Sequence, residues 1–390
     1  MAGARVRLGL SRFLDNPREY VGDGRVGLVA NYNAVNEKGN PLILALHEHP
    51  DVNLTAIYVP EHGLWGAEQA GVRVGHGVDD VTGVRVFSLY GENLKPTPEM
   101  LAEVDVLLID TRDMGCRYTT GSSTMVLCME AAAELGKPVV VMDRPNPLGG
   151  TVLEGNVLHE DFRSFVGFHT ISIKHGLTAG ELAVMYNTET GLNADLTVVQ
   201  MEGWEREMLY PETGLLWVSS PNLPTFESIA VYPGTCLFEG TNCSEGRGTT
   251  KPFRLIGSPW LDEVRLAKDL NSAGLPGVVF RPTRFIPLYS KYNGEVCRGV
   301  EVHITDVNAI EPVRLGVLMV YMIRQQDIER FQWRGFEDQA TGGRIFIDLL
   351  TGGTQFRQWI DEGRTPDEIM EVWRPELAAF AQRREQYLLY

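Results

Sequence analysis

Short apolar runs that end in polar residues recur through the first 150 residues of the chain. Each run is rich in Val, Ile and Leu, which is typical of strands buried on both faces of a parallel sheet. The runs cover residues 25–30, 54–59, 104–109 and 138–142, and the polar residues after them begin at Asn31, Glu61, Asp110 and Asp143. Because the carboxyl ends of parallel strands meet at one edge of the sheet, we expect these polar residues to share a cleft.

Helical stretches separate these runs, and the alternation predicts βαβ units. We expect one helix over residues 41–49 and a longer one over 122–135, which ends before Gly136. A further helix is predicted to begin at Thr97, with its hydroxyl as the N-cap and Pro98 in the first turn.

The pattern changes near Gly149 and Gly150. Beyond them, strand-like segments cover residues 165–173, 196–201, 278–285 and 299–304, capping signals lie at Thr178 and Thr365, and residues 211–260 are rich in loop formers. A length of 390 residues also favours two domains. We therefore predict an α/β protein with a parallel-sheet domain in residues 1–150, a smaller α+β domain in residues 151–390, and the site between them.

Composition narrows the class of partner. The net charge is −16, from 35 basic and 51 acidic residues, which argues against a nucleic-acid partner but allows a small anionic ligand. No apolar run is long enough to span a membrane. Residues 1–14 contain no apolar core of a signal peptide, so we expect a cytoplasmic protein, or a secreted or periplasmic one if a leader has been removed.

The five cysteines form no CxxC pair, and the histidines have no metal-binding spacing. We therefore expect reduced thiols, no metal site and no cofactor. The chain also contains no GxSxG elbow, no GxxxxGK[ST] phosphate loop, and no GxGxxG after the first run. The remaining signal is a set of carboxylates around a cleft, and two such groups are the usual equipment of glycoside hydrolysis.

Glu61 and His62 are the first candidates, because Pro60 must end the preceding strand at the expected cleft. Glu61 fits a general acid or base, and the alternative is a carboxylate that closes a turn or pairs with an arginine. His62 fits a second acid or base or a binding group, although a single histidine is more often structural.

Two further polar clusters are candidates. Asp110, Asp113, Arg117 and Tyr118 follow the third run, where an Asp–Arg pair could equally well close the turn. Residues 239–250 contain two glutamates, Glu239 and Glu245, with Arg247 and several small residues, and glycines there would let a ligand approach the backbone. An ordinary turn-rich loop is the alternative.

These residues also carry a family resemblance. The chain resembles the NamZ-type exo-β-N-acetylmuramidases, a peptidoglycan glycoside hydrolase family formerly known as a domain of unknown function. Seven motifs occur in the family's order across nearly the whole chain, and they lie at residues 60–63, 88–91, 110–118, 143–147, 175–183, 220–224 and 245–249. The chain departs from the family's pattern at Arg112, where glutamine is expected.

The resemblance implies a Rossmann-like catalytic domain, an α+β domain that completes the cleft, and release of β-1,4-linked N-acetylmuramic acid from non-reducing ends of peptidoglycan fragments. It places the catalytic glutamate at Glu61. The second group stays open, with Glu245 and Asp110 as our candidates and direct assistance by the acetamido group of the substrate as the alternative. The lactyl carboxylate of the substrate would need a cation, for which Arg117, Arg144 and Arg247 are the candidates. Further expected substrate contacts are Asn31, His62, Asp113, Tyr118 and Asn222.

Two other functions are compatible with the sequence. A non-catalytic muropeptide-binding protein would keep the arginines and aromatic residues but would tolerate loss of Glu61. A nucleotide-binding α/β enzyme is the third alternative, and the missing phosphate loop speaks against it.

Overall fold

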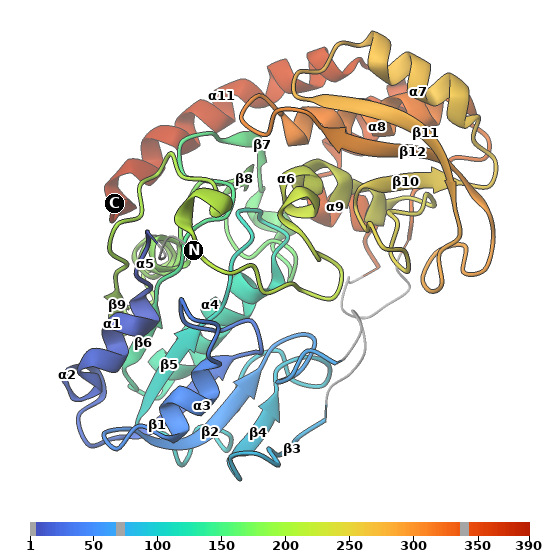
Figure 1. Ribbon diagram of the computed structural model, residues 1–390. Helices are drawn as coiled ribbons and strands as arrows, with labels where there is room; N and C mark the ends of the chain where they lie inside the picture. The colour runs from blue at the N-terminus through green and yellow to red at the C-terminus, as the bar shows by residue number, and fades with distance from the viewer. Residues whose placement is uncertain (1–4, 68–74, 336–342) are drawn as a thin grey trace.

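A seven-stranded sheet forms the lower half of the molecule in the computed structural model, which describes residues 5–67, 75–335 and 343–390 (Figure 1). Its order is β3-β4-β2-β1-β5-β6-β9, and every neighbouring pair is parallel except β3–β4. The strands are β1 (Arg25–Ala30), β2 (Asn53–Val59), β3 (Gly77–Val78), β4 (Arg85–Ser88), β5 (Val106–Asp110), β6 (Val139–Met142) and β9 (Leu196–Val199). All four predicted strands of the first 150 residues are therefore confirmed, and they are adjacent in the sheet.

Both faces of this sheet are covered, which explains why its strands are almost continuously apolar. In β5, Leu107 and Ile109 face a core shared with α4 and α5, whereas Leu108 faces a second core shared with α1 and α3. All five residues of β5 are buried. The helices of this half are α1 (Gly9–Asp15), α2 (Pro17–Val21), α3 (Leu42–His47), α4 (Thr120–Glu134) and α5 (Ala179–Glu189).

The last strand of the sheet lies beyond residue 150, the expected end of the first domain. Strand β9 pairs in parallel with β6, and α5, which precedes β9, packs on the same sheet. A two-stranded ribbon, β7 (Glu154–Val157) and β8 (Ser172–Lys174), interrupts this path. The sheet layer therefore draws on residues well past the point where the sequence pattern changes.

The second half is built on the antiparallel sheet β10-β12-β11, with strands at Leu255–Ser258, Cys297–Ile304 and Val278–Phe285. Its helices are α6 (Phe226–Thr235), α7 (Glu263–Ser272), α8 (Pro312–Gln326), α9 (Phe346–Thr351), α10 (Gln355–Glu362) and α11 (Pro366–Arg384). Short 3-10 turns lie at Glu160–Phe162, Tyr210–Thr213, Cys236–Gly240 and Glu385–Tyr387. The parallel sheet followed by a smaller α+β part confirms the predicted fold class.

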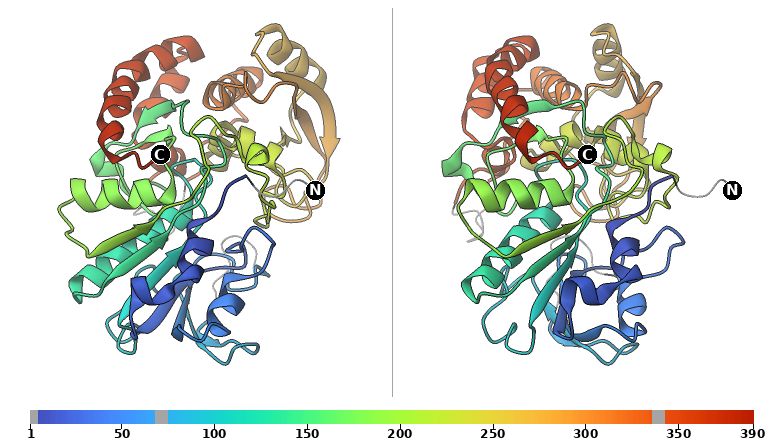
Figure 2. Two further views of the ribbon diagram at one scale, coloured as in Figure 1. Left: turned by 60° about the vertical axis from the view of Figure 1, so that its left-hand side comes forward. Right: turned by 90° about the vertical axis from the view of Figure 1, so that its left-hand side faces the viewer.

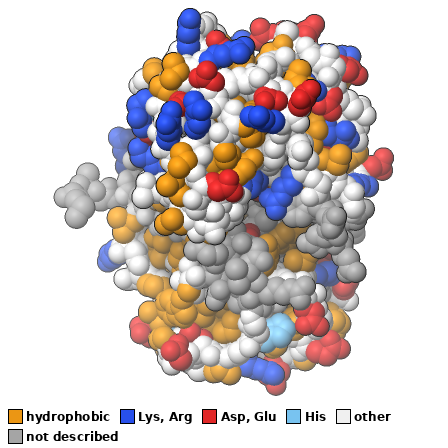
Figure 3. Space-filling view, turned by 90° about the vertical axis from the view of Figure 1, so that its right-hand side faces the viewer, with side chains coloured by type: hydrophobic (Ala, Val, Ile, Leu, Met, Phe, Trp, Pro, Cys, Tyr) orange, Lys and Arg blue, Asp and Glu red, His pale blue; other side chains and the backbone are white. Residues whose placement is uncertain are grey.

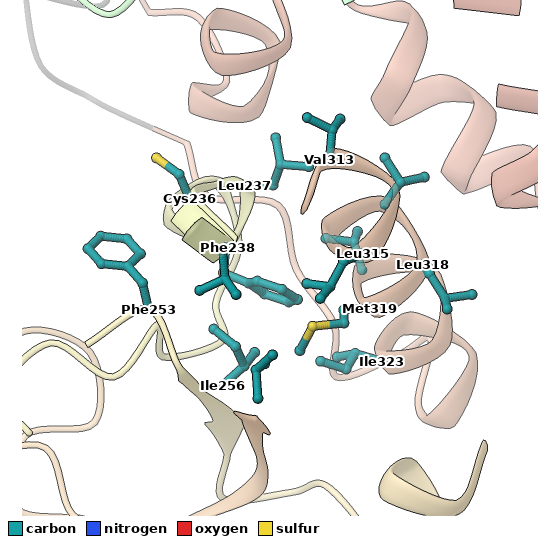
Figure 4. Close-up of a cluster of buried hydrophobic side chains, with 14 of the residues drawn as sticks. Cys236, Leu237, Phe238, Phe253, Ile256, Val313, Leu315, Leu318, Met319 and Ile323 are labelled. Atoms are coloured by element: carbon teal, nitrogen blue, oxygen red, sulfur yellow. The ribbon is translucent and has the colours of Figure 1, made fainter. Parts of the chain in front are cut away.

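The core of the second half lies between α8, α6 and the antiparallel sheet (Figure 4). Phe238 and Ile256 face Leu315 and Met319 of α8, and all four are fully buried. Gly234 of α6 allows a close crossing with α8, because a Cβ atom there would lie 1.8 Å from the carbonyl oxygen of Pro312. A substitution by alanine would therefore force these helices apart.

The end of the chain returns to the parallel-sheet half, and in both views of Figure 2 the C-terminus lies against it. The hydroxyl of Tyr390 donates a hydrogen bond of 2.8 Å to Asp143, directly after β6. The backbone N–H of Leu389 donates to Glu181 of α5 at 2.8 Å. These contacts tie the two halves together at the side of the sheet.

Two expectations about local structure are wrong. The segment that begins at Thr97 forms successive hydrogen-bonded turns and no α-helix. Its one hydrogen bond with helical spacing runs from the backbone N–H of Leu101 to the carbonyl of Thr97. Within the expected strand over 165–173, only the last residues are extended, as part of β8. The loop-rich region 211–260 contains α6 and β10, because aromatic and aliphatic residues there pack into the core. Among the described residues, no helix has the length and apolar character to cross a membrane.

Candidate active site

A cavity of about 710 Å³ lies at the carboxyl edge of the parallel sheet and is closed by the second half of the chain. Strand β1 lies between β2 and β5, so the strand order continues through β2 on one side of β1 and through β5 on the other. Such a switch point is where open α/β sheets bind their ligands. The cavity is lined by seven of the residues expected from the sequence: Asn31, Glu61, His62, Tyr118, Asn222, Glu245 and Arg247.

Glu61 enters the cavity directly after β2, where Pro60 ends the strand. Thr120, the first residue of α4, donates a hydrogen bond of 3.2 Å from its hydroxyl to the Glu61 carboxylate. The Tyr90 hydroxyl also interacts with Glu61, and burial together with this negative charge raises the pKa of Tyr90. Tyr90 therefore stays protonated at neutral pH, so it can donate a proton to the hydrogen bond but cannot act as a base.

His62 has a φ angle of +77°, in the left-handed region that non-glycine residues rarely adopt. Gly63 follows with φ +71°, so the turn after β2 needs two successive residues in this region. Strained residues of this kind cluster at functional sites. The turn holds both Glu61 and His62 at the wall of the cavity.

A charged cluster from the second half forms the opposite wall. Arg247 donates to Glu239 at 2.5 Å and lies 3.2 Å from Glu245 through its Nε. Lys291 donates to Glu245 at 2.9 Å and to the carbonyl of Phe238 at 2.6 Å. Two cations and two carboxylates therefore balance one another here.

The charges in this cluster fix the protonation of Glu245. Burial alone would raise its pKa, but the charges of Lys291 and Arg247 outweigh burial, so the pKa of Glu245 is lowered. The pKa of Arg247 is raised because the charges of Glu239 and Glu245 outweigh the effect of burial. Glu245 is therefore an ionised carboxylate at neutral pH and cannot serve as a proton donor.

Four expected site residues lie outside the cavity lining. Asp110 is fully buried and is held by the guanidinium of Arg144, with one bond of 2.8 Å and one shorter. Arg144 also donates to the carbonyl of Val35 at 2.9 Å. These two residues form a buried pair that closes the strand ends, as in the Asp–Arg alternative. Neither side chain lines the cavity, so the catalytic role of Asp110 and the substrate contact of Arg144 stay predictions that the geometry does not favour.

Asp113 and Arg117 are also internal. Asp113 accepts hydrogen bonds from Ser122 and from the backbone of Gly115, and it lies 3.1 Å from Nε2 of His175. Arg117 is 1% exposed, and its guanidinium donates to three backbone carbonyls at 2.7–2.9 Å, those of Asn156, Ile171 and Leu350. Both residues hold loops beneath the cavity, so neither is supported as a substrate contact.

The structure also brings residues to the cavity that the sequence analysis did not select as site residues. Arg112 follows β5 and lies beside Asn33, another lining residue. Asn222 accepts a hydrogen bond from Tyr289 of the second half. Further lining residues outside the expected set are Tyr90, Thr120 and Arg334, and Glu239 of the candidate cluster at residues 239–250 also lines the cavity. Arg112 and Tyr90 occur inside the motifs at residues 110–118 and 88–91, so these motifs could have indicated both residues as part of the site.

Comparisons with known proteins place the whole chain in one family. Residues 26–227 match the N-terminal domain of the exo-β-N-acetylmuramidase NamZ, and residues 230–390 match its C-terminal domain. The peptidoglycan β-N-acetylmuramidase NamZ of Bacillus subtilis strain 168 is 44% identical over 387 residues, which cover 99% of this chain and 92% of that protein.

Two crystal structures of DUF1343 family proteins from Bacteroides fragilis NCTC 9343 have the same fold. One has a TM-score of 0.89 at 36% sequence identity, and the other a TM-score of 0.75 at 29% identity. In each case 99% of both chains is covered. With both domain matches and a close relative over nearly its full length, the chain belongs to the NamZ family of exo-β-N-acetylmuramidases.

Proposed function

We propose that this protein is a glycoside hydrolase that releases β-1,4-linked N-acetylmuramic acid from the non-reducing ends of peptidoglycan fragments. Family membership supports the reaction, since the Bacillus subtilis relative is a peptidoglycan β-N-acetylmuramidase. The observation that carries the proposal in this chain is the position of Glu61, a carboxylate at the carboxyl edge of β2 inside a cavity large enough for a sugar.

Glu61 is proposed as the general acid. It would protonate the glycosidic oxygen as the bond to the next sugar breaks. The hydroxyl of Thr120 and that of Tyr90 contact this carboxylate and would fix its direction. Glu239 and Glu245 also line the cavity, where both form ion pairs with Arg247, and the lowered pKa of Glu245 makes that carboxylate a poor proton donor.

The same ion pairs bear on the second catalytic group. Glu245 contacts Lys291 and Arg247, and two cation partners make a carboxylate a weak base and a weak nucleophile. We propose that the acetamido group of the substrate attacks the anomeric carbon instead, as some glycosidases allow. The acetamido oxygen would displace the leaving sugar, which departs with the proton from Glu61, and water would then open the cyclic intermediate from the face that the sugar left, returning a proton to Glu61. Two displacements retain the anomeric configuration, so ¹H NMR during turnover should show the β-anomer of the released sugar first. The α-anomer as first product would contradict it.

Release of free N-acetylmuramic acid from a disaccharide with this sugar at its non-reducing end tests the proposal. Mass spectrometry should detect the free sugar with the muramyl disaccharide, and much less cleavage of the disaccharide that carries N-acetylglucosamine in its place. Tight binding of the muramyl disaccharide without any cleavage would favour a non-catalytic muropeptide-binding protein. Cleavage of both disaccharides at equal rates would favour a general hexosaminidase over a muramidase.

A further inference from the structure

A buried guanidinium without a carboxylate partner lines the cavity. Arg112 is 6% exposed and donates to two backbone carbonyls, to Val218 at 2.9 Å and to Asn33 at 3.4 Å. Among the described residues, no carboxylate lies within ion-pair distance of Arg112, because the nearby Asp110 is paired with Arg144. A guanidinium has five N–H groups, so the two carbonyls leave donors for a ligand.

Aromatic rings hold this guanidinium in place. Its central carbon lies 5.3 Å from the ring centre of Trp217 and 5.5 Å from that of Tyr210. Cation–π contacts of this kind stabilise a cation but do not neutralise it. Burying a charge is costly unless an opposite charge compensates for it, so an incoming anion would be favoured at this position.

The other cations expected to meet an anionic substrate are already engaged. Arg117 and Arg144 lie outside the cavity lining, and Arg247 is balanced by Glu239 and Glu245. Arg112 differs from all three, because it combines access to the cavity with an uncompensated charge. Unpartnered polar atoms lie close by: among the described residues, Oδ1 of Asn33 and Nδ2 of Asn222 have no hydrogen-bond partner, and both residues line the cavity.

The spacing of the sheet relates Arg112 to the proposed acid. Glu61 follows β2 and Arg112 follows β5, with β1 between these strands. Two strand spacings separate their backbones by about 10 Å. A single pyranose ring with one substituent can bridge that distance once the two side chains reach inward. An anion carried on the sugar that is cleaved would therefore reach Arg112 while the glycosidic oxygen lies at Glu61.

We propose that Arg112 binds the carboxylate of the lactyl substituent on the muramyl sugar and thereby strengthens the selection of this sugar over N-acetylglucosamine, beyond what the uncharged amide of the glutamine expected at this position could provide. This inference rests on the proposed function and adds a residue that helps to distinguish the two sugars. The guanidinium can bind a carboxylate through two parallel hydrogen bonds, which an ammonium group cannot reproduce. Arg112 is thus a binding residue, and its effect should fall mainly on KM.

A cycle that changes both the enzyme and the substrate tests this directly. The substrates are a chromogenic β-N-acetylmuramic acid glycoside and the same compound with its lactyl carboxylate converted to a methyl amide. The enzymes are the wild type, Arg112→Gln and Arg112→Lys, with Arg247→Gln as the matched cavity arginine whose charge is already balanced. Steady-state kinetics give kcat and KM for each pair.

We expect Arg112→Gln to lower kcat/KM for the acid roughly 10- to 100-fold through KM, the range of one charge-assisted hydrogen bond. The loss with the amide should be several-fold smaller, and Arg112→Lys should lie between the wild type and Arg112→Gln. Arg247→Gln should impair both substrates by a similar factor. Equal turnover of acid and amide by the wild type, or equal losses for both with Arg112→Gln, would overturn the inference.

Calorimetric binding separates this inference from the proposed function. If the wild type cleaves neither glycoside, the proposed function fails, but the inference still predicts that free N-acetylmuramic acid binds at least 10-fold more tightly than N-acetylglucosamine. Arg112→Gln, which introduces the residue expected of the family, should reduce that preference several-fold. If Arg112→Gln does not fold, Arg112→Lys and the two substrates with the wild type still give the comparison. Equal binding of the two sugars by the wild type would contradict the inference.

Discussion

The hydroxyl of Thr120 donates a hydrogen bond of 3.2 Å to the carboxylate of Glu61, and this bond joins the start of α4 to the end of β2. Helix α4 follows β5, so the contact crosses the sheet over β1. It fixes the direction of the proposed acid from the rigid parallel-sheet half. Hydroxyl contacts of this kind support a catalytic carboxylate without adding a charge.

Thr120→Val should lower kcat about tenfold, which corresponds to about 1.4 kcal/mol for one hydrogen bond to a charged group, and should leave KM nearly unchanged. The shape of the side chain is retained, so only the hydroxyl contact is lost. Thr119→Val is the matched control, because the Thr119 hydroxyl has no hydrogen-bond partner among the described residues. Equal effects of the two substitutions on kcat would remove the special role of the Thr120 contact.

The buried pair of Asp110 and Arg144 gives a prediction about stability. Asp110→Asn should reduce the free energy of unfolding by about 3–5 kcal/mol, because Arg144 would keep its charge in a site that excludes water. Urea unfolding measures the change. The control is Asp105→Asn, which removes an exposed pair with Arg25 and should cost much less. The molecules of Asp110→Asn that remain folded should keep their affinity for the substrate.

A large loss of kcat in fully folded Asp110→Asn would contradict this account. It would return Asp110 to the catalytic machinery that the sequence suggested. The contradiction would be clearest if Asp110→Asn showed the melting transition of the wild type and still lost kcat.

Asp143 predicts a pH dependence of stability. Burial raises the pKa of Asp143 from 3.8 to about 6, against hydrogen bonds from Gly180, Thr178 and Tyr390 that favour the ionised form. The folded state therefore binds a proton more tightly than the unfolded state. The resulting stability is fully present below pH 4 and is lost as the pH rises through about 6, by about 3 kcal/mol in total.

Asp143→Asn should abolish this term. The amide fits the site, because Oδ1 accepts from two backbone N–H groups while Oδ2 meets the hydroxyls of Thr178 and Tyr390, which can accept as well as donate. Urea unfolding between pH 4 and 7.5 should show the wild type losing stability relative to Asp143→Asn as the pH rises. A constant difference between the two proteins across this range would contradict the prediction.

The parallel sheet could be predicted from the sequence, because strands that are buried on both faces are almost continuously apolar. The sequence was less informative near Thr97, where the capping signals were present but the segment forms successive turns that end at Val104, two residues before β5 begins. Strand β9 joined the first sheet from beyond residue 150, because sheet membership depends on contacts distant in sequence. Nothing local in residues 196–201 distinguishes that sheet from the other.

For the site, strand ends predicted which residues lie near the cavity but not which way they face. Glu61 and Asp110 both follow strands of one sheet, yet Glu61 lines the cavity while Asp110 turns inward to Arg144. Arg112 and Arg117 differ in the same way, because Arg112 lines the cavity whereas the guanidinium of Arg117 donates to three backbone carbonyls away from it. Pairing partners supplied by distant segments decide such cases, and a single sequence does not reveal them.

The central claim is that Glu61 protonates the leaving group. The dependence of kcat on the leaving group, compared between the wild type and Glu61→Gln, tests this claim most directly. We would measure kcat for the wild type and Glu61→Gln with a muramyl disaccharide, whose sugar alkoxide must be protonated to leave, and with an activated nitrophenyl glycoside, whose phenolate leaves unaided. We predict that Glu61→Gln lowers kcat by a factor of at least ~10² with the disaccharide and by a much smaller factor with the nitrophenyl glycoside. Equal losses with both substrates, or undiminished cleavage of the disaccharide, would contradict it.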